Sequence, residues 1–403
     1  MVRLARGLRA ESLVMCFGVV FLLAASCAAQ QQLPAPLTDH GPYSAGFRVL
    51  YPAREGGPQD LWVVAVWYPS EAAEQSYEYP GRGLPGVKAL SRVAADAPAA
   101  RRGGPYPLII AAHGLFGSAR GLAYLGEYLA RHGYVVVSTD WRDLLAPNYT
   151  TQMAAGRLGP GNVFRSGLAF LAAARLWLRD MEPHPEKVLD YLERVRLRPA
   201  EELLDYALSL NSQPDSFLEG LIAEQRVGMM GHSLGGYTTL GLIGANPHPD
   251  FHDERIKAAV LLSCGFLPYS GHVQDVTVPA LVMYGEHDPA GLGDPEDRYR
   301  LYAQLGGPRE CVAIAGANHF TFSNPRDLPL NDCWQRDPKR AVIVSYVQAF
   351  FAAHLLGDEQ AHARLHQPTA GVMYLAWQHP GRPEHTWGTR PNLSAEPRSL
   401  HGR

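Results

Sequence analysis

The sequence lacks any long block of like charges. Its 403 residues include 36 lysine and arginine and 39 aspartate and glutamate residues, which gives a formal net charge of -3. Because these charges are spread along the chain, no basic stripe offers the contact that nucleic acids require. A nucleic-acid partner is therefore not expected. The composition, 46% hydrophobic and 10% aromatic, indicates a globular protein with one large core or two modest ones.

The N-terminus lacks an apolar run long enough to cross a bilayer. Arginines precede an apolar run from Leu13 to Ala25, which is shorter than the roughly 20 residues that a spanning helix needs. Small residues follow in "AASCAAQ", and this order is that of a secretory signal peptide. We therefore expect residues 1–29 to be a signal peptide and the protein to be exported. "LAASC" also resembles a relaxed lipobox, so acylation of Cys27, which would attach the protein to a membrane, is an open alternative.

Cysteine is scarce, with five residues in the whole chain. Cysteines within the predicted signal peptide aside, Cys264, Cys311 and Cys333 remain. An oxidising compartment favours a bond between two of these. Because Cys264 ends the apolar run "AAVLLSC" and is expected to be a buried thiol, the predicted disulfide joins Cys311 to Cys333.

No C-x-x-C pair occurs, so a metal site is not expected. The C-terminal segment 358–403 is rich in proline and arginine and is predicted to be an extended or poorly ordered tail. Its histidines are interpreted as solvated side chains, and they are His362, His366, His379, His385 and His401.

Short apolar runs alternate with helical patterns through the rest of the chain. Most of the runs are apolar nearly throughout, as expected for strands buried on both faces of a sheet. The eight predicted strands are "FRVLYP", "LWVVAVWYP", "YPLIIAAHG", "YVVVSTD", "RVGMMGHS", "IKAAVLLSC", "ALVMYGEHD" and "ECVAIAGANH". Helical patterns at 118–131, 234–246 and 294–305 indicate βαβ units. Residues 41–357 are therefore predicted to form one α/β domain, with a mainly parallel, eight-stranded sheet covered by helices. Its first two strands are expected to be antiparallel, and its closing helix to end at Gly357.

One connection is longer than a simple crossover needs. Residues 142–225, before the strand that leads to Ser233, contain the helical patterns "VFRSGLAFLAAARLWLRDM", "PEKVLDYLERVRL", "AEELLDYALSL" and "DSFLEGLIAEQ". We interpret this segment as a helical insertion before the nucleophile strand. Two roles are open: it covers one edge of the sheet, or part of it forms a lid or pocket wall.

"GHSLGG" places Ser233 between a predicted strand and a predicted helix. Gly231 and Gly235 remove side chains that would collide in so tight a turn. By itself a G-x-S-x-G pattern is compatible with a turn that has no chemistry. In this strand-turn-helix context it is typical of a nucleophilic serine.

A nucleophilic serine needs a base and an acid that orients the base. Asp288 follows the strand "PALVMYGEHD" and His319 follows "ECVAIAGANH", so serine, acid and histidine occur in the order that this fold requires. Backbone N–H groups of Leu115, after "IIAAHG", and of Leu234 are expected to form an oxyanion hole. Phe116 is expected to be a pocket wall or a core residue. These residues together predict a serine hydrolase that uses no cofactor.

The run "LIIAAHGLFGSARGLAYLGEYLARHGYVVVSTDWRD" resembles the same region of the secreted and lipoprotein-associated platelet-activating factor acetylhydrolases. "GPYSAGFRVLYPAR", "WVVAVWYPS" and "GHSLGGYT" fit that family and the neighbouring dienelactone hydrolase-like proteins of the α/β-hydrolase fold. The resemblance runs from about residue 41 to residue 356. It implies Ser233 as nucleophile, His319 as base, and cleavage of a small-molecule or lipid carboxylic ester, with a short acyl chain, through an acyl-enzyme.

The chain departs from the acetylhydrolases at the acid. That family carries its aspartate after the strand that follows the serine helix, where this sequence reads "VLLSCGFLP" and has no carboxylate. Asp288, one strand later, matches dienelactone hydrolases and cutinase-type polyester hydrolases, and "GANHF" also resembles the latter. Glu286 or a carboxylate near Cys264 are alternative acids. Alternative functions are a dienelactone hydrolase-like or polyester-cleaving esterase, a peptidase of the same fold, and a catalytically silent binding protein.

Overall fold

The computed structural model describes residues 33–52, 63–79, 89–115, 117–141, 184–288, 295–324, 330 and 332–389. The predicted signal peptide with Cys27 lies outside the described residues, as do Phe116 and the first part of the predicted insertion. The chain divides into two units, residues 1–35 and 36–403, and the elements described below all belong to the second. Among the described residues, every helix is too short or too polar to cross a membrane.

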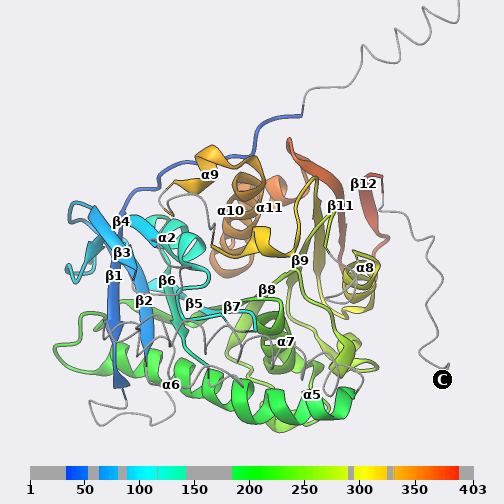
Figure 1. The fold of residues 1–403 in the computed structure, drawn as a ribbon, viewed down its shortest axis with the longest axis horizontal. Coiled ribbons are helices and arrows are strands. Elements are labelled where there is room, and N and C mark those ends of the chain that lie inside the picture. Colours follow the sequence, from blue (N-terminus) through cyan, green and yellow to red (C-terminus); the bar gives the residue numbers. More distant parts are fainter. Residues whose placement is uncertain are drawn as a thin grey trace, which may run out of the picture. The chain divides into compact units, whose positions relative to one another are not determined.

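The described residues of the second unit form a twelve-stranded sheet in the order β12-β11-β10-β9-β8-β7-β5-β6-β2-β1-β4-β3 (Figure 1). The strands are β1 (Ser44–Leu50), β2 (Val64–Ser70), β3 (Gln75–Tyr79), β4 (Ala89–Ala95), β5 (Tyr106–Ala112), β6 (Val135–Thr139), β7 (Ile222–His232), β8 (Ile256–Leu262), β9 (Ala280–Gly285), β10 (Arg309–Ile314), β11 (Val372–Gln378) and β12 (His385–Gly388). The strands from β5 to β10 pair in parallel. β1 and β2 are antiparallel, as the sequence predicts. The mainly parallel α/β sheet is therefore confirmed.

All eight predicted strands are present, and four more extend the sheet at its edges. β3 and β4 lie at one edge, and β11 and β12 at the other. The prediction of an extended or poorly ordered tail is wrong for residues 358–389. Asp358 caps the helix α11 (Glu359–Leu365), and β11 pairs antiparallel with β10. Burial of apolar side chains such as Leu375 of β11 in the core beneath α10 and α11 explains why a segment of tail-like composition folds.

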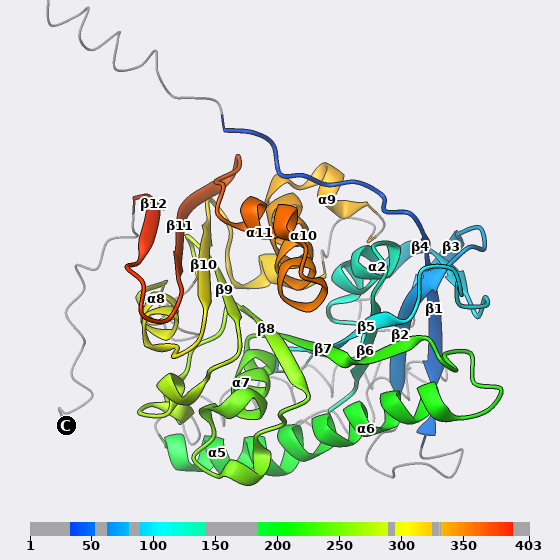
Figure 2. The same ribbon diagram turned by 180° about the vertical axis from the view of Figure 1, so that it is seen from behind.

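Helices cover both faces of the sheet (Figures 1 and 2). Within the described ranges the α-helices are α2 (Ala123–Arg131), α5 (Pro185–Leu192), α6 (Arg198–Ser212), α7 (Leu234–Leu240), α8 (Pro295–Gln304), α9 (Cys333–Arg336), α10 (Pro338–Phe351) and α11. α2, α9, α10 and α11 bury their apolar side chains in one core, and α5 to α8 bury theirs in a second core on the opposite face. The closing helix α10 continues to Leu356 and ends at Gly357 in the left-handed region, as predicted.

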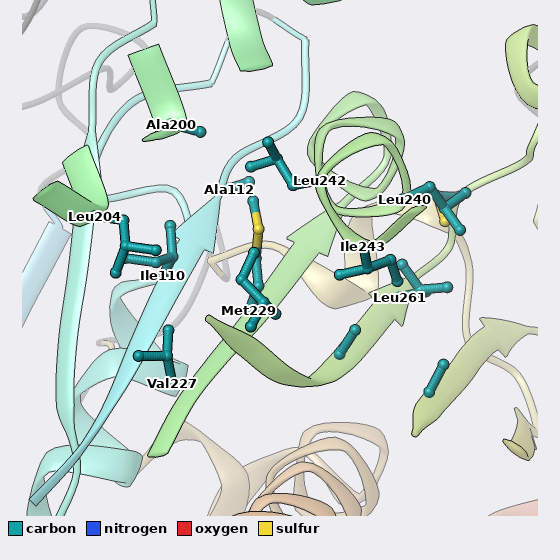
Figure 3. Close-up of a cluster of buried hydrophobic side chains, with 14 of the residues drawn as sticks. Ile110, Ala112, Ala200, Leu204, Val227, Met229, Leu240, Leu242, Ile243 and Leu261 are labelled. Carbon is teal, nitrogen blue, oxygen red and sulfur yellow. The ribbon is translucent and has the colours of Figure 1, made fainter. Parts of the chain in front are cut away.

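The strand that leads to Ser233 lies in the middle of the sheet. Val227 and Met229 of β7 pack beside Ile110 of β5 and Leu261 of β8, under Leu204 of α6 (Figure 3). All five side chains are almost completely buried. Burial of one such side chain contributes about 1.5–3 kcal/mol to stability, so this core holds the end of β7 firmly in place.

The predicted helical insertion is only partly correct where the structure describes it. Residues 185–197 and 198–212 are helical and cover one face of the sheet. The pattern "DSFLEGLIAEQ" is not a helix, because residues 215–220 form turns and β7 already begins at Ile222. Ile222 pairs with Tyr106 of β5, and this pairing outweighs the weak helical periodicity of a short segment.

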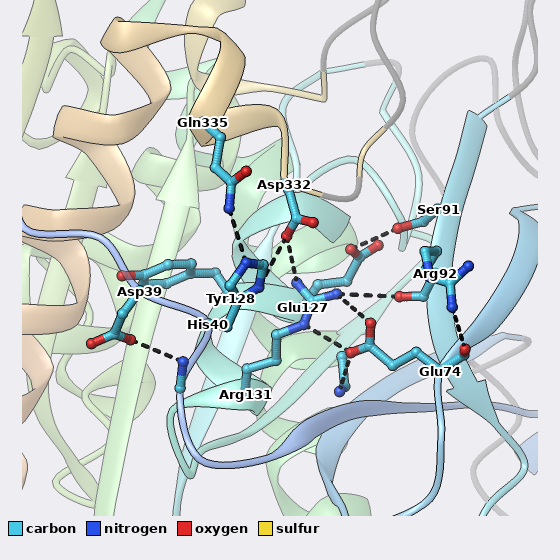
Figure 4. Close-up of polar contacts among 12 residues, drawn as sticks. Asp39, His40, Glu74, Ser91, Arg92, Glu127, Tyr128, Arg131, Asp332 and Gln335 are labelled. Atoms are coloured by element: carbon cyan, nitrogen blue, oxygen red, sulfur yellow. Dashed lines mark hydrogen bonds and ion pairs between the residues drawn. The ribbon is translucent and has the colours of Figure 1, made fainter.

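A buried polar network connects α2 to the added strands β3 and β4 (Figure 4). The Arg131 guanidinium donates two hydrogen bonds to Glu74, from Nε at 2.8 Å and from Nη2 at 2.9 Å. Ser91 Oγ of β4 donates to Glu127 Oε2 of α2 at 2.7 Å. Glu127 is completely buried, and this burial raises its pKa to about 7. The carboxyl group of Glu127 therefore titrates near neutral pH.

The predicted disulfide between Cys311 and Cys333 is wrong. Both residues are buried, and neither forms a disulfide. Cys311 on β10 points into the core covered by α5 to α8, whereas Cys333 at the start of α9 lies in the core on the opposite face. The side chain of Cys311 points to one face of the sheet, and α9 with Cys333 covers the other face. The sheet therefore separates two cysteines that are near one another in sequence. The prediction that Cys264 is buried is confirmed.

Candidate active site

Ser233 occupies a strained turn between β7 and α7. Its φ of 55° and ψ of -121° lie in a region that residues other than glycine rarely adopt. Its neighbours explain how so tight a turn is tolerated. A Cβ atom on Gly235 would lie 2.0 Å from the carbonyl oxygen of Ala112, so a side chain there would collide with the end of β5. The turn leaves the Ser233 side chain partly exposed.

His319 follows β10 and contacts Ser233 directly. Its Nε2 lies 3.0 Å from Ser233 Oγ, which is hydrogen-bond distance. A short 3₁₀ helix, His319–Phe322, carries the residue, and Asn318 caps it by accepting a hydrogen bond from the Phe320 N–H. Thr321 Oγ1 in turn accepts from the Asn318 N–H at 3.0 Å. This reciprocal cap fixes the backbone from which the imidazole projects.

Asp288 lies on the other side of the His319 ring but does not hydrogen-bond to it. Its Oδ1 is 3.6 Å from His319 Nδ1, which is too long for a hydrogen bond. Ser263, which directly follows β8, bridges this gap. Its Oγ is 2.8 Å from each carboxylate oxygen of Asp288 and 2.9 Å from His319 Nδ1. A hydroxyl has one hydrogen to donate, so it donates to the carboxylate and accepts from Nδ1–H.

The surroundings of Asp288 favour its charged form. Burial alone raises the pKa of this carboxyl, but the interaction with His319, the charge of Arg298 and hydrogen bonds from Ser263 and the Gly285 N–H outweigh it, so the pKa lies below its usual value. Arg298 Nε is 3.8 Å from Asp288 Oδ2, and both side chains are completely buried. Asp288 is therefore an anion at neutral pH.

Glu286, the alternative acid, has a different environment. It lies on the surface, and its Oε2 accepts a hydrogen bond from the Gly316 N–H at 2.8 Å. The group beside Cys264 that contacts His319 is the Ser263 hydroxyl and not a carboxylate. Of the candidate acids, Asp288 is the one that the structure brings to the imidazole.

His232 is a residue of the site that the sequence reasoning missed. It is buried, and its Nε2–H donates to the carbonyl oxygen of His319 at 2.8 Å. Burial, together with the nearby His319, lowers the pKa of His232 to about 3. The residue is therefore neutral and holds the His319 backbone. The sequence signal that could have identified His232 as a residue of the site is its position directly before Ser233 in "GHS".

The loop after β5 lies against the serine turn. A Cβ atom on Gly114 would lie 3.2 Å from Ser233 Cβ, so Leu115 and Leu234 follow two residues that are in close contact. Arg196, from the helical insertion, is completely buried and donates to the His113 carbonyl oxygen at 2.9 Å and to that of Gly114 at 3.4 Å. The insertion therefore fixes the loop in which an oxyanion hole is expected.

The predicted pocket residue Phe116 lies outside the described residues. In the described part of the chain, Phe320, which the sequence reasoning did not single out, lies beside the imidazole. The Phe320 ring stands perpendicular to His319 at 5.5 Å between ring centroids, and the residue is 54% exposed. An exposed aromatic ring next to the imidazole is suited to contact with an apolar part of a ligand.

Comparisons with known proteins point to one family. The family model described as "Platelet-activating factor acetylhydrolase, isoform II" matches residues 37–324. The platelet-activating factor acetylhydrolase of Cavia porcellus is 23% identical over 312 residues, which cover 70% of this chain and 67% of that protein. The acetylhydrolase of Canis lupus familiaris is 24% identical over 244 residues, 56% of this chain and 49% of that protein. Cutinase est2 of Thermobifida alba is 27% identical over 222 residues, 55% of each chain. The matches therefore span two thirds of the first relative and about half of the other two.

Proposed function

The chain belongs to the platelet-activating factor acetylhydrolase isoform II family and is a carboxylic ester hydrolase, and on this premise we propose that it works through an acyl-enzyme on Ser233. The observation that carries the proposal is the 3.0 Å contact between Ser233 Oγ and His319 Nε2 on a strained, partly exposed turn. A serine hydroxyl becomes nucleophilic when a positioned base takes its proton.

In the proposed reaction, His319 Nε2 accepts the hydroxyl proton as Ser233 Oγ attacks the acyl carbon. The negatively charged oxygen of the tetrahedral intermediate accepts hydrogen bonds from the backbone N–H groups of Leu115 and Leu234. Nε2 then gives the proton to the departing alcohol, which leaves the acyl group on Ser233. Water, deprotonated by His319 in the same way, releases the carboxylic acid and restores the serine.

Asp288 acts in this reaction as the orienting acid, and it acts through Ser263. Asp288 Oδ1 and His319 Nδ1 are 3.6 Å apart, and the Ser263 hydroxyl lies between them, 2.8 Å from the carboxylate and 2.9 Å from Nδ1. Ser263 therefore orients the imidazole through its hydrogen bonds to both residues. With a hydrogen on Nδ1, the lone pair of Nε2 faces Ser233, as a base requires. Ser263 is in this proposal a positioning residue, and the anionic Asp288 stabilises the imidazolium that forms during turnover.

For the substrate we propose an ester with a short acyl chain. This follows from the similarity to the acetylhydrolases, while the similarity to Cutinase est2 supports a polyester or longer-chain ester as the alternative. A series of nitrophenyl esters of increasing acyl length separates the two. Highest kcat/KM on two or three carbons supports the first substrate class, and highest kcat/KM on eight or more carbons contradicts it.

We also propose that the protein is exported, either free after cleavage of residues 1–29 or attached through acylated Cys27. The N-terminal sequence supports export, and lipidation is the finer alternative. Mass spectrometry of the mature N-terminus in a native host distinguishes them. A retained Met1 contradicts both.

Replacement of Ser233 by alanine tests the mechanism. We expect the turnover of a nitrophenyl ester to fall about a million-fold while the circular dichroism spectrum is unchanged, because a methyl group still fits the turn. Ser138→Ala, at a buried serine of β6, is the control for loss of a serine hydroxyl and should keep full activity. A Ser233→Ala variant that keeps a tenth of the activity is incompatible with the proposed nucleophile.

A further inference from the structure

Three histidines of the C-terminal segment lie together in the structure. His362 lies in α11 and His366 directly follows it, so the two share one side of the helix. His379 directly follows β11. One ligand nitrogen from each lies within 4.8 Å of those of the other two, and all three residues are half-buried. Their interpretation as solvated tail residues is therefore wrong.

A buried carboxylate lies behind this cluster. Glu310, on β10, has a side chain that is 1% exposed. Its Oε1 lies 3.4 Å from His354 Nε2 and 3.8 Å from His366 Nε2. Within the described part of the chain, neither carboxylate oxygen accepts a hydrogen bond. A buried carboxylate of this kind needs nearby positive charge to offset the loss of water.

We propose that His362, His366 and His379 bind a divalent transition metal ion of the Zn²⁺ class, with Glu310 as the carboxylate behind the ligands. Because Nε2 of His366 faces Glu310, its Nδ1 is the nitrogen left for the metal. A metal-bound histidine that contacts a carboxylate through its other nitrogen is the usual arrangement at such sites, and it orients the ring. Three imidazoles with water as the fourth ligand suit Zn²⁺, and also Co²⁺ and Ni²⁺.

The geometry needs a small contraction. Bonds of about 2.0–2.1 Å from zinc to nitrogen place tetrahedral ligands roughly 3.4 Å apart. The three nitrogens lie within 4.8 Å of one another, so side-chain rotation has to bring them closer by up to about 1.4 Å. Neighbouring aromatic rings limit this movement. His366 stacks on Trp377 at 4.6 Å between ring centroids and 10° between planes, which holds its ring in one plane.

The position of the cluster indicates a structural role. The three ligands connect α11 to the end of β11, and Glu310 lies at the beginning of β10. His319 follows the other end of β10, so the metal does not contact the reacting atoms. α11 and β11 follow residues 37–324, the part that the family model matches, whereas β10 with Glu310 lies within that part. A bound metal therefore holds α11 and the end of β11 together, outside the part that the family model matches, and leaves ester hydrolysis unchanged.

Zinc titration of the full chain, purified with a tag that contains no histidine and stripped with EDTA, tests the proposal. We expect one Zn²⁺ per chain by calorimetry, a tetrahedral visible spectrum with Co²⁺, and a higher Tm when zinc is added. His362→Ala and His379→Ala should each weaken zinc binding at least tenfold, and Glu310→Gln by about 10–100-fold. His385→Ala is the matched control, because His385 stacks on the same Trp377 but lies outside the cluster.

Esterase turnover of every variant reports whether the catalytic domain is folded, so a loss of zinc binding with full turnover supports the site. Equal zinc affinity of the wild type, His362→Ala and His379→Ala overturns the proposal. Wild-type protein without stoichiometric binding at micromolar zinc overturns it as well. Because binding can be measured on Ser233→Ala too, its outcome is independent of the proposed ester hydrolysis.

Discussion

Ser263→Ala removes the hydroxyl between Asp288 and His319 and leaves 3.6 Å between Asp288 Oδ1 and His319 Nδ1. A hydrogen bond to a charged group contributes about 1.5–3 kcal/mol, and 1.36 kcal/mol corresponds to a factor of ten in rate. We therefore expect kcat to fall about 10- to 100-fold. KM should be unchanged, because Ser263 is completely buried and lies behind the imidazole. The loss is smaller than the roughly 10⁴-fold loss at a triad whose acid is replaced, because the Asp288 carboxylate still stabilises the imidazolium that forms during turnover.

The assay is steady-state hydrolysis of a short nitrophenyl ester, with the far-ultraviolet spectrum as a control for folding. Ser138→Ala, at a serine that is also buried, controls for the loss of a hydroxyl from the core. The double variant Ser263→Ala with Asp288→Asn gives the sharper test. If Asp288 acts through Ser263, loss of the hydroxyl costs little once the acid has been replaced. Equal costs in both backgrounds, or a change in KM alone, would refute the reasoning.

Other predictions follow from the same geometry. Asp288→Asn should lower kcat about 10⁴-fold while Glu286→Gln costs little, and the opposite ranking in ester hydrolysis would move the acid to Glu286. Arg196→Met should lower kcat up to about 100-fold with little change in KM, because the loop that carries Leu115 loses two hydrogen bonds. An unchanged kcat would show that these hydrogen bonds do not position the oxyanion hole. The raised pKa of Glu127, about 7, means that the folded protein keeps a proton that the unfolded chain loses near pH 4.3, so the stabilisation from this group is lost as the pH rises through 7. The free energy of unfolding of Glu127→Gln, measured with urea and taken relative to that of the wild type, should therefore be up to about 3 kcal/mol higher at pH 8 than at pH 5. The same relative value at both pH values contradicts this.

The sequence predicted the central strands and the residues that their ends carry. Ser233, Asp288 and His319 were predictable because long apolar strands mark where each loop begins, and parallel strands bring these loops to one edge of the sheet. Ser263 was not predictable. A serine after a strand has no pattern of its own, and its role depends on a distance of 3.6 Å between two other side chains.

The failures share a physical cause, which is contact between segments far apart in sequence. Cys311 and Cys333 are close in sequence, but the sheet separates them. The segment after Gly357 has the composition of a tail, and it folds because the open edge of β10 offers hydrogen bonds to β11. That pairing also places His379 beside α11, which no spacing of histidines along the chain could indicate.

Covalent trapping with a fluorophosphonate probe tests the central proposal most directly. The wild-type protein should take up one probe molecule, and peptide mass spectrometry should find it on Ser233, because only a serine activated by a neighbouring base reacts readily. Ser233→Ala should remain unlabelled, and Ser263→Ala should label more slowly than the wild type. Folded wild-type protein that takes up no probe, or that carries it on another serine, would contradict the proposed nucleophile and favour a catalytically silent binding protein.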